Sequence, residues 1–471
     1  MSILSAVFNN KIQNFEQAFN VKDITSSAMK EAIKDWFWLY YNEFPNETED
    51  PCQRLPFTVV NKLTKTVFSE YEAKGSNDFS VSLLAALDRR KKQAMQQTLI
   101  GGEAFLKPIF VNGRIEFSVI PRRNYIVLAR NELAAITDIG TQESTEVGGF
   151  YYTLLERRTI DTNGMLTIES RLYRSDSKDV IGTQVPLTAL DKYAAIQPVF
   201  TLPQPLWSLG LIPIKTPVEN CVDGSEDGVS VYAPAVGLIH LININEKQIN
   251  GEFERGESRI IVSNDLMMKD ATTGKRRFKD HIFSGLDDDP ENVGVTIFNP
   301  ELREHSFLNR KQEYLRNIET LLGFKRGIFS DVQETDKTAT EITNSAGDYN
   351  LAIIDFQQMW ESAVKEAIRV CSILGPMYQI SGATQLDPDK DVEINWGDGV
   401  LFDRTRTWTE YQSMVASGML KPEIAVAWYF DLPFPQSETD LQKIRDMYMP
   451  EMEQLTQGGE GEGEGAGNAN A

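Results

Sequence analysis

The side chains that could carry out chemistry in this chain are few and widely spaced. The three histidines, His240, His281 and His305, are not paired at the short spacings of metal-binding motifs. Three consecutive aspartates beginning at Asp287 could bind a divalent cation, but they lack the spacing of a calcium loop, and such a run is more often a solvated acidic turn. The sequence contains no P-loop, nucleophile elbow or Rossmann glycine pattern. We therefore predict a protein that is not an enzyme, with no metal and no cofactor. The alternative is a metal-dependent hydrolase or nuclease that uses acidic clusters.

The cysteines give no second route to a metal site. Cys52, Cys221 and Cys371 are odd in number and far apart in the sequence. This arrangement matches neither a disulfide framework nor paired zinc ligands. We expect all three to be reduced and mostly buried.

The most informative stretch runs from Phe324 to Pro376 and contains a long amphipathic helix. Thr338 and Glu341 have the spacing of a capping box, which predicts that the helix begins there. Apolar residues then recur in steps of three and four and form one helix face. They are Ile353, Phe356, Trp360, Val364, Ala367, Cys371 and Leu374. Gly375 and Pro376 are predicted to end the helix.

The start of this helix contains a run of small, turn-favouring residues, Asn344 to Asp348. Gly347 alone costs about 1 kcal/mol relative to alanine in a helix interior. We therefore predict that the long helix is interrupted near its start by a kink or a loop.

Upstream of this stretch, the pattern predicts two helices separated by a segment of short strands and turns. Ser230–Arg255 is predicted to be helical, with Pro234 in its first turn. Short strands and turns follow from Arg259 to Arg303. A second helix is predicted from Ser306, as N-cap, to about Leu322.

The N-terminal half combines helices with strands. Three helices are predicted, at Asp23–Asn42, Phe57–Ala73 and Val81–Leu99. The third carries a basic run, Arg89 to Lys92, which could contact phosphate but is more often a solvated helix face. From Gly101 the pattern changes to strands. They are Ala104–Phe110 and Ile115–Ile120, joined by an Asn-Gly turn, then Tyr151–Arg158, Leu166–Tyr173 and Leu211–Ile214. The predicted fold class is α+β.

The C-terminal part is predicted to be mainly helical. A strand at Asp391–Trp396 precedes a helix that Asp403 caps and Gly418 stops. Pro422 begins a second helix, and Ser437 caps a third. The last residues, 456–471, are rich in glycine and glutamate, have nothing to bury, and are predicted to be disordered.

The order of these segments resembles the portal proteins of tailed bacteriophages, specifically the siphovirus-type head-to-tail portal family. The resemblance lies in the Gly-x-Phe at Gly327 to Phe329, Asp331, and the Lys-Thr-Ala-Thr-Glu run that ends at Glu341 and opens a long helix. In that family a ring, most often a dodecamer, occupies one capsid vertex, and genomic DNA passes through its channel.

The resemblance implies a multi-domain portal fold. Its expected parts are a wing (1–229), stem helix 1 (230–257), a clip (258–304), stem helix 2 (305–326), the tunnel loop with a long wing helix (327–396), crown helices (397–455) and a disordered tail (456–471).

The resemblance also implies functional residues. The expected DNA-channel residues of the tunnel loop are Asn344, Ser345, Gly347, Asp348 and Asn350. The expected lumen residues of the stem are Glu246, Lys247, Asn250, Arg310, Glu313 and Arg316. The expected docking residues of the clip are Met268, Lys275, Arg276 and Arg277.

The partners implied by the resemblance are macromolecules. They are further copies of the chain, double-stranded phage DNA, the large terminase (the packaging ATPase), the major capsid protein, the scaffold, and head-tail connector or adaptor proteins. The implied location is the virion, after assembly in the host cytoplasm. No membrane is expected, because no apolar run approaches the roughly 20 residues needed to span a bilayer.

Length and charge agree with such a conduit without indicating it. With 471 residues the chain should form more than one domain. Its net charge of -21 argues against tight DNA binding, which depends on lysine and arginine. A channel needs DNA to slide, and a mostly negative wall keeps binding weak. Taken alone, an acidic composition more often serves solubility.

Overall fold

The structure is a computed structural model of the chain. It describes residues 15–42, 53–111, 113–178, 180–256, 259–262, 268–269, 276–277, 295–298, 301–331, 339–397, 404–430, 432, 434–435 and 437–449. The chain divides into two compact units, Met1–Gly397 and Asp398–Ala471.

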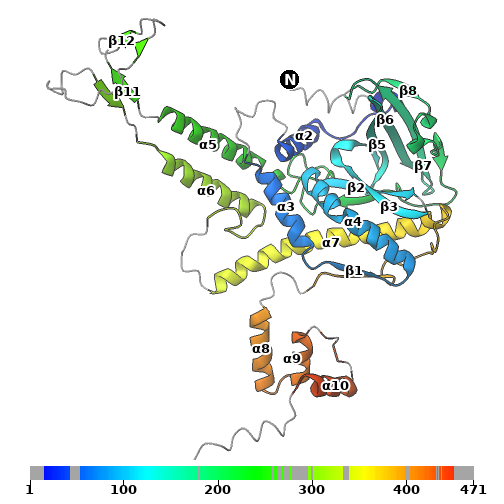
Figure 1. Cartoon of the computed structure of the whole chain (residues 1–471). Helices are drawn as coiled ribbons and strands as arrows, with labels where there is room; N and C mark the ends of the chain where they lie inside the picture. The colour runs from blue at the N-terminus through cyan, green and yellow to red at the C-terminus, as the bar shows by residue number, and fades with distance from the viewer. Residues whose placement is uncertain are drawn as a thin grey trace, which may run out of the picture. The chain divides into compact units, whose positions relative to one another are not determined.

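Three N-terminal helices pack with a long later helix around the main core of the first unit (Figure 1). They are α2 (Ser27–Tyr41), α3 (Leu55–Val67) and α4 (Asp78–Gly101), and the later helix is α7 (Ala339–Met377). Capping fixes their starts: the Ser26 hydroxyl accepts from the Met29 amide, and Asn77 and Ser80 form a reciprocal capping box. Trp36 and Trp360 are among the largest fully buried side chains of the described residues.

The predicted extension of α3 to Ala73 is wrong. The helix ends at Val67, and the chain forms β1 (Glu72–Gly75), which pairs antiparallel with β15 (Val392–Asn395). The apolar residue Tyr71 lies against Trp396, at 4.9 Å between ring centroids. Packing onto a distant strand therefore outweighs the local helical spacing.

Two sheets follow the helices. The smaller has the order β10-β2-β3, with β2 (Glu103–Val111), β3 (Arg114–Pro121) and β10 (Ile212–Lys215). Val111 pairs with Arg114 across the predicted two-residue Asn-Gly turn, where Gly113 has φ +72°.

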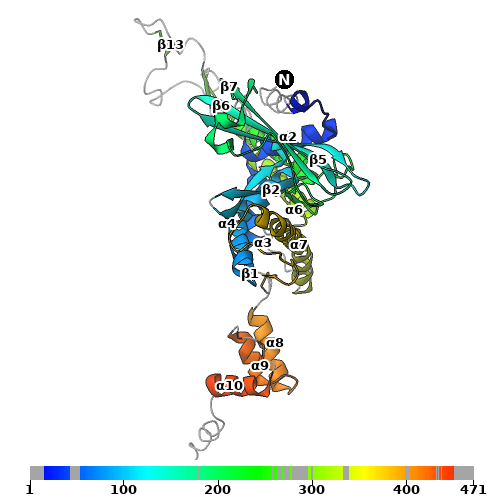
Figure 2. The same cartoon turned by 90° about the vertical axis from the view of Figure 1, so that its right-hand side faces the viewer.

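The larger sheet has the order β4-β5-β6-β7-β8, with β9 pairing to β7. Its strands β5, β6 and β7 are labelled in Figure 2. Its strands are β4 (Tyr125–Arg130), β5 (Ile136–Val147), β6 (Phe150–Ile160), β7 (Leu166–Ser175), β8 (Thr183–Val185) and β9 (Val199–Thr201). The strands predicted at β6 and β7 are confirmed, and so is the mixed α+β class. No strand was predicted at β4 or β5. We call the two sheets, α2 to α4 and α7 the body.

The predicted pair of helices separated by short strands is confirmed. A 3-10 turn at Ala233–Ala235, with Pro234 in it, leads into α5 (Val236–Arg255), and α6 (Glu304–Leu321) follows. Between them β11 (Arg259–Val262) pairs with β14 (Val295–Phe298), and β12 (Met268–Lys269) pairs with β13 (Arg276–Arg277). The predicted Ser306 N-cap is wrong, because Arg303 occupies that position.

The start of α5 is anchored in the main core of the body. Tyr232 is fully buried, and its hydroxyl donates to the Trp36 carbonyl oxygen at 2.8 Å. The Ser230 hydroxyl donates to the Leu99 carbonyl oxygen at 3.0 Å, and the Val231 amide donates to the same oxygen. Both α2 and α4 therefore hold the segment that precedes α5.

The apolar stripe of α7 is confirmed at every predicted position, since all seven side chains are buried. The predicted interruption at Asn344–Asp348 is wrong, because the backbone is helical from Ala339 to Met377. A helix already nucleated on both sides tolerates one glycine at a cost of about 1 kcal/mol. Pro376 lies in the last turn, so the helix ends just beyond the predicted residue.

The second unit contains the three predicted helices, α8 (Arg404–Ala416), α9 (Pro422–Tyr429) and α10 (Glu438–Tyr448). The Ser437 side chain accepts from the Asp440 amide, as predicted. Aromatic contacts join α8 to α9, with Trp408 and Tyr429 at 4.6 Å between ring centroids. The predicted cap Asp403 and the predicted disordered tail lie outside the described residues.

Candidate functional site

The main candidate functional site is the pair of helices α5 and α6. The two helices bury Ile242, Leu315 and Ile318 at their common base in the main core. Further along, the Lys311 ammonium pairs with the Glu246 carboxylate at 2.8 Å, and the Arg303 guanidinium makes a bidentate contact with Glu252. An apolar base and outer ion pairs therefore hold α5 and α6 together.

The Arg303 contact perturbs the acidity of its partner. Hydrogen bonds from Arg303 lower the pKa of the Glu252 carboxyl to about 2, and they raise the pKa of Arg303. Glu252 therefore stays ionised throughout the neutral range.

The six expected lumen residues fall into two groups. Lys247, Asn250, Arg310 and Glu313 are exposed. Glu246 and Arg316 are half-buried. Glu246 faces Lys311 of the neighbouring helix, so it is a pairing residue as well as a lumen candidate. Their assignment to a channel lumen stays a prediction.

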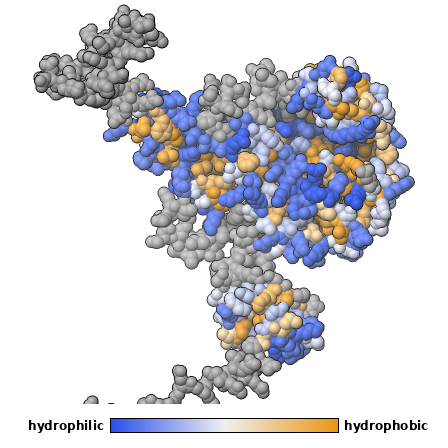
Figure 3. Space-filling view, in the orientation of Figure 1, coloured by the Kyte–Doolittle hydropathy of each residue, from blue (hydrophilic) through white to orange (hydrophobic). Residues whose placement is uncertain are grey.

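The outer faces of the pair expose large apolar side chains. On α5, Ile244 is 50% and Leu241 41% exposed, and on α6 Leu308 is 46% exposed. Hydrophobic patches lie among hydrophilic residues over these helices (Figure 3). Phe253, near the end of α5, is 48% exposed as well. Contiguous apolar surface of this kind is typical of contacts with another protein chain.

The remaining expected residues are placed in part. Met268 pairs with Arg277 across β12 and β13, and Arg276 lies beside them on β13, whereas Lys275 lies outside the described residues. The five tunnel residues between Asn344 and Asn350 lie on the helical backbone of α7. Gly327, of the Gly-x-Phe motif, has φ +89°, a conformation that favours glycine. Lys337 and Thr338 lie outside the described residues.

The basic run on α4 is occupied within the chain. Arg89 pairs with Glu116 at 2.6 Å, and Arg90 donates to the Phe117 carbonyl oxygen at 3.1 Å. Lys91 pairs with Asp88 at 2.5 Å. Arg89 and Arg90 therefore join α4 to β3, and Lys91 pairs within α4, which supports the helix-face alternative for these three residues.

No metal centre forms in the part of the chain that the structure describes: no three His, Cys, Asp or Glu side chains gather there in a group that could hold an ion. His240 instead faces Asp35 at 3.2 Å. His281 and the aspartates from Asp287 lie outside the described residues. Among the described residues, no helix is long and apolar enough to cross a bilayer.

The cysteine prediction is correct for Cys371 and wrong for Cys221. Cys371 is fully buried on α7, and burial raises the pKa of its thiol. Cys221 is exposed, because it lies in the polar turn between Asn220 and Asp227. Cys52 lies outside the described residues.

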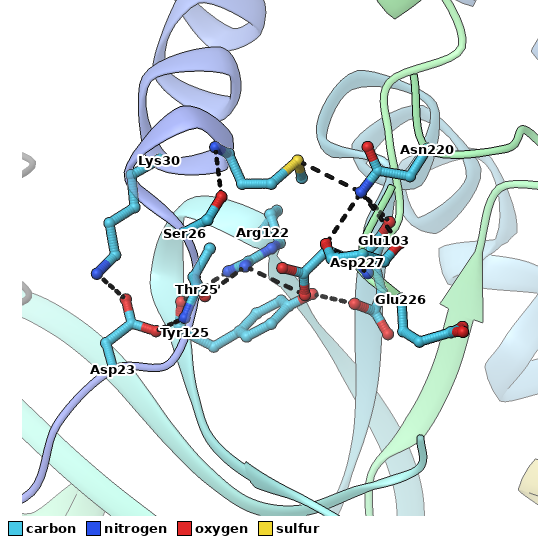
Figure 4. A network of polar contacts seen from close by, with 12 residues as sticks. Asp23, Thr25, Ser26, Lys30, Glu103, Arg122, Tyr125, Asn220, Glu226 and Asp227 are labelled. Carbon is cyan, nitrogen blue, oxygen red and sulfur yellow. Dashed lines mark hydrogen bonds and ion pairs between the residues drawn. The ribbon is translucent and has the colours of Figure 1, made fainter. Parts of the chain in front are cut away.

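A buried polar network in the body had no signal in the sequence (Figure 4). Arg122 is 2% exposed, and it donates to the Thr25 hydroxyl at 3.1 Å and to the Tyr125 carbonyl oxygen at 3.3 Å. The Tyr125 hydroxyl donates to the Glu103 carboxylate at 2.9 Å, and Asp227 lies 3.9 Å from Arg122. Burial raises the pKa of Glu103, although Arg122 opposes that effect. The network ties the segment before α2 to β2, β4 and the turn before α5.

A cleft of about 1160 Å³ adjoins this network. Its lining includes Glu103, Trp207 and residues of α7 such as Asp355. Both basic side chains on its wall are paired: Arg130 with Asp227 at 2.8 Å, and Lys215 with Glu226 at 3.8 Å. Among the described residues, no three His, Cys, Asp or Glu side chains converge in the cleft as the metal-dependent alternative would require.

Among curated proteins, none matches the chain. Two similar solved structures are described as the neck of an empty GTA particle and the virion of a native gene transfer agent particle. The first is 12% identical, with a TM-score of 0.48 and coverage of 85% of this chain and 94% of that chain. The second is 12% identical, with a TM-score of 0.45 and coverage of 87% and 100%.

The family assignment rests on the family model alone. The model of the phage portal protein family, SPP1 Gp6-like, matches residues 71–451. This range contains α5, the strands between the helices, α6, the Gly-x-Phe turn and α7. The chain therefore belongs to the SPP1 Gp6-like family of phage portal proteins.

Proposed function

We propose that this chain is the subunit of a portal ring at one capsid vertex, and that double-stranded DNA passes through the ring during packaging and ejection. The proposed ring contains twelve copies. The observation that carries the proposal is the family match over residues 71–451. The protein is proposed to act as a conduit and docking platform in the virion, assembled in the host cytoplasm, with the energy of packaging supplied by a separate ATPase.

The helix pair is proposed to be the stem of the ring. Its exposed apolar residues, Leu241, Ile244 and Leu308, suit contact with neighbouring copies. Exposed polar residues such as Lys247 and Glu313 then remain for the lumen. Because the chain carries a net charge of -21, most of the wall that DNA meets is expected to repel it, which favours sliding over binding.

The strands between α5 and α6 are proposed to be the docking end for the large terminase and later for connector or adaptor proteins. Two-stranded pairs such as β11 with β14 are marginally stable alone. Adjacent subunits are proposed to support them. Deleting residues 268–279 is expected to leave the body folded and to abolish terminase binding, and normal binding by the deleted ring would remove this assignment.

The first turns of α7 are proposed to line the channel as helix. In a ring, Asp348 would present repeated negative charge to the DNA backbone. The outer body is proposed to contact the major capsid protein and the scaffold.

Electron microscopy and mass measurement of the purified protein test the proposal first. A portal gives rings with a central hole and a mass of many chains, whereas the hydrolase alternative gives one to four chains without a channel. The absence of rings under all assembly conditions would overturn the proposal.

Charge reversal then tests the lumen. Glu313→Lys is expected to slow DNA packaging by assembled rings, because it adds a cation where phosphates pass. Glu132→Lys makes the same charge change in an exposed turn of the body and serves as the matched control. Equal packaging rates for the two variants would remove Glu313 from the lumen.

A further inference from the structure

The turn that joins α6 to α7 is built around one buried carboxylate. Glu319, in the last turn of α6, is fully buried. Its carboxylate accepts four hydrogen bonds, three from backbone amides of the Gly-x-Phe turn and one from a hydroxyl. The donors are the Gly327 amide at 3.2 Å, the Phe329 amide at 2.5 Å, the Ser330 amide at 2.8 Å and the Ser330 hydroxyl at 2.8 Å.

The four donors fill the carboxylate's acceptor positions without a cation. No salt bridge to Glu319 occurs among the described residues. Burial raises the pKa of the Glu319 carboxyl, but the donated hydrogen bonds outweigh burial and bring the pKa below its usual value. The side chain is therefore ionised at neutral pH and is stabilised by dipoles of the turn alone.

The turn is also packed from both sides. Phe329 meets Phe324 edge to face, with ring centroids 5.3 Å apart, and the Asp331 amide donates to Gln312 of α6 at 2.8 Å. Phe324 belongs to the same core cluster as Ile353 and Phe356 of α7. The segment that leads into the turn lies beside α7, because a Cβ on Gly323 would be 3.9 Å from the Cβ of Ala352.

We propose that Glu319 is a positioning residue that locks the Gly-x-Phe turn to α6 and so fixes where α7, from Ala352 onwards, stands relative to the helix pair. This inference rests on the proposed function, since it assigns to Glu319 the alignment of the α7 segment with the stem. Glutamine would place N–H donors against the amide donors of the turn, and aspartate is one methylene shorter than glutamate. Glutamate is therefore required at this position.

Hydrogen exchange and packaging on full-length rings test the proposal. Glu319→Gln is expected to speed amide exchange at Phe329 and Ser330 by about tenfold, because each loses a bond to a charged acceptor. It is expected to lower the DNA packaging rate per assembled ring at least as much, while ring yield and the exchange of α6 residues 308–318 stay unchanged. Glu304→Gln, at the far end of α6, is the control and is expected to match the unmodified protein.

A milder variant keeps the test decisive if Glu319→Gln fails to assemble. Ser330→Ala removes only the hydroxyl donor, and it is expected to shift exchange and packaging in the same direction by a smaller factor. If unmodified rings package DNA and the variants package it at the same rate per ring, the proposed role of Glu319 is overturned and the proposed function is not. Loss of packaging only in proportion to loss of assembled ring would also overturn it. Unmodified protein that forms no DNA-packaging ring would instead overturn the proposed function.

Discussion

The body and the helix pair both contain ion pairs, but they place them in different surroundings. In the body, Glu156 lies between Arg158 at 2.5 Å and Lys107 at 2.6 Å, and the Glu156 and Arg158 side chains are 5% and 8% exposed. In the helix pair, the Arg303 side chain that contacts Glu252 is 69% exposed. Water can replace a lost partner in the second case but not in the first. Charge changes in the body should therefore affect folding, and those in the helix pair should affect what the outer surface contacts.

The largest expected effect comes from removing a cation from the body. Arg158→Ala leaves the buried Glu156 carboxylate underpaired, and it orphans the Leu209 carbonyl oxygen, which Arg158 contacts at 2.9 Å. We expect the free energy of unfolding to fall by about 3–5 kcal/mol, measured by urea denaturation of the full chain. Arg303→Ala removes the mostly exposed ion pair with Glu252 in the helix pair, and it should lower the free energy of unfolding much less. Equal losses for the two variants would break the comparison.

Acid should weaken the same cluster. Burial raises the pKa of Glu156, but Arg158 and Lys107 outweigh it and lower the pKa to about 2. The unfolded chain has the ordinary glutamate value, so the contribution of Glu156 is fully present above about pH 4.5 and is lost as the pH falls towards 2. A shift of this size corresponds to about 3 kcal/mol. Unfolding free energies across this pH range should fall less steeply in Glu156→Gln, and identical slopes would contradict the assignment.

Within the body, closely packed and open backbone positions should also differ in how well they tolerate a side chain. Gly102 (φ +83°) ends α4, and a Cβ there would lie 2.3 Å from the Gly228 carbonyl carbon. Gly113 (φ +72°) is in a tight turn with open space around it. Gly102→Ala should cost about 3 kcal/mol, from the positive φ and the backbone clash, and Gly113→Ala only about 1 kcal/mol. Thermal unfolding of both variants measures the difference, and similar midpoints would show that the close approach can relax.

The smallest expected effect is in the helix pair. The Glu246 and Lys311 side chains are both about one-fifth exposed, so a double-mutant cycle with alanine should give a coupling below about 1 kcal/mol. Ring yield should be unchanged in each variant. A coupling as large as the Arg158 effect would mean that the helix pair depends on its ion pairs as the body does.

Much of the helical structure could be predicted from sequence. All seven apolar positions predicted from Ile353 to Leu374 are buried, because a 3.6-residue period indicates which helix face packs on the core. Strand β5 was not predicted, because it is mostly polar and is held by its pairing with β4 and β6. The break at Asn344–Asp348 was wrong because local propensity is weak against a helix supported on both sides.

The candidate site was predictable only in outline. Spacing located the two helices, but it gave no sign that Glu246 faces Lys311 or that Glu319 holds the Gly-x-Phe turn. Glu103, Arg122 and Asp227 are likewise brought together only by the tertiary fold. Contacts between residues far apart in sequence carry no periodicity, so a single sequence cannot report them.

The anchored start of α5 makes that helix a lever. Tyr232 and Ser230 fix the base of α5, because they are buried and donate hydrogen bonds to carbonyl oxygens of α2 and α4. With 20 residues at 1.5 Å each, α5 is about 30 Å long, so a rotation of about 10° at its base moves its far end by about 5 Å. The Arg303–Glu252 contact transmits that movement to α6. Such a rotation at the base would therefore displace the far end of α5 by about the rise of one helical turn.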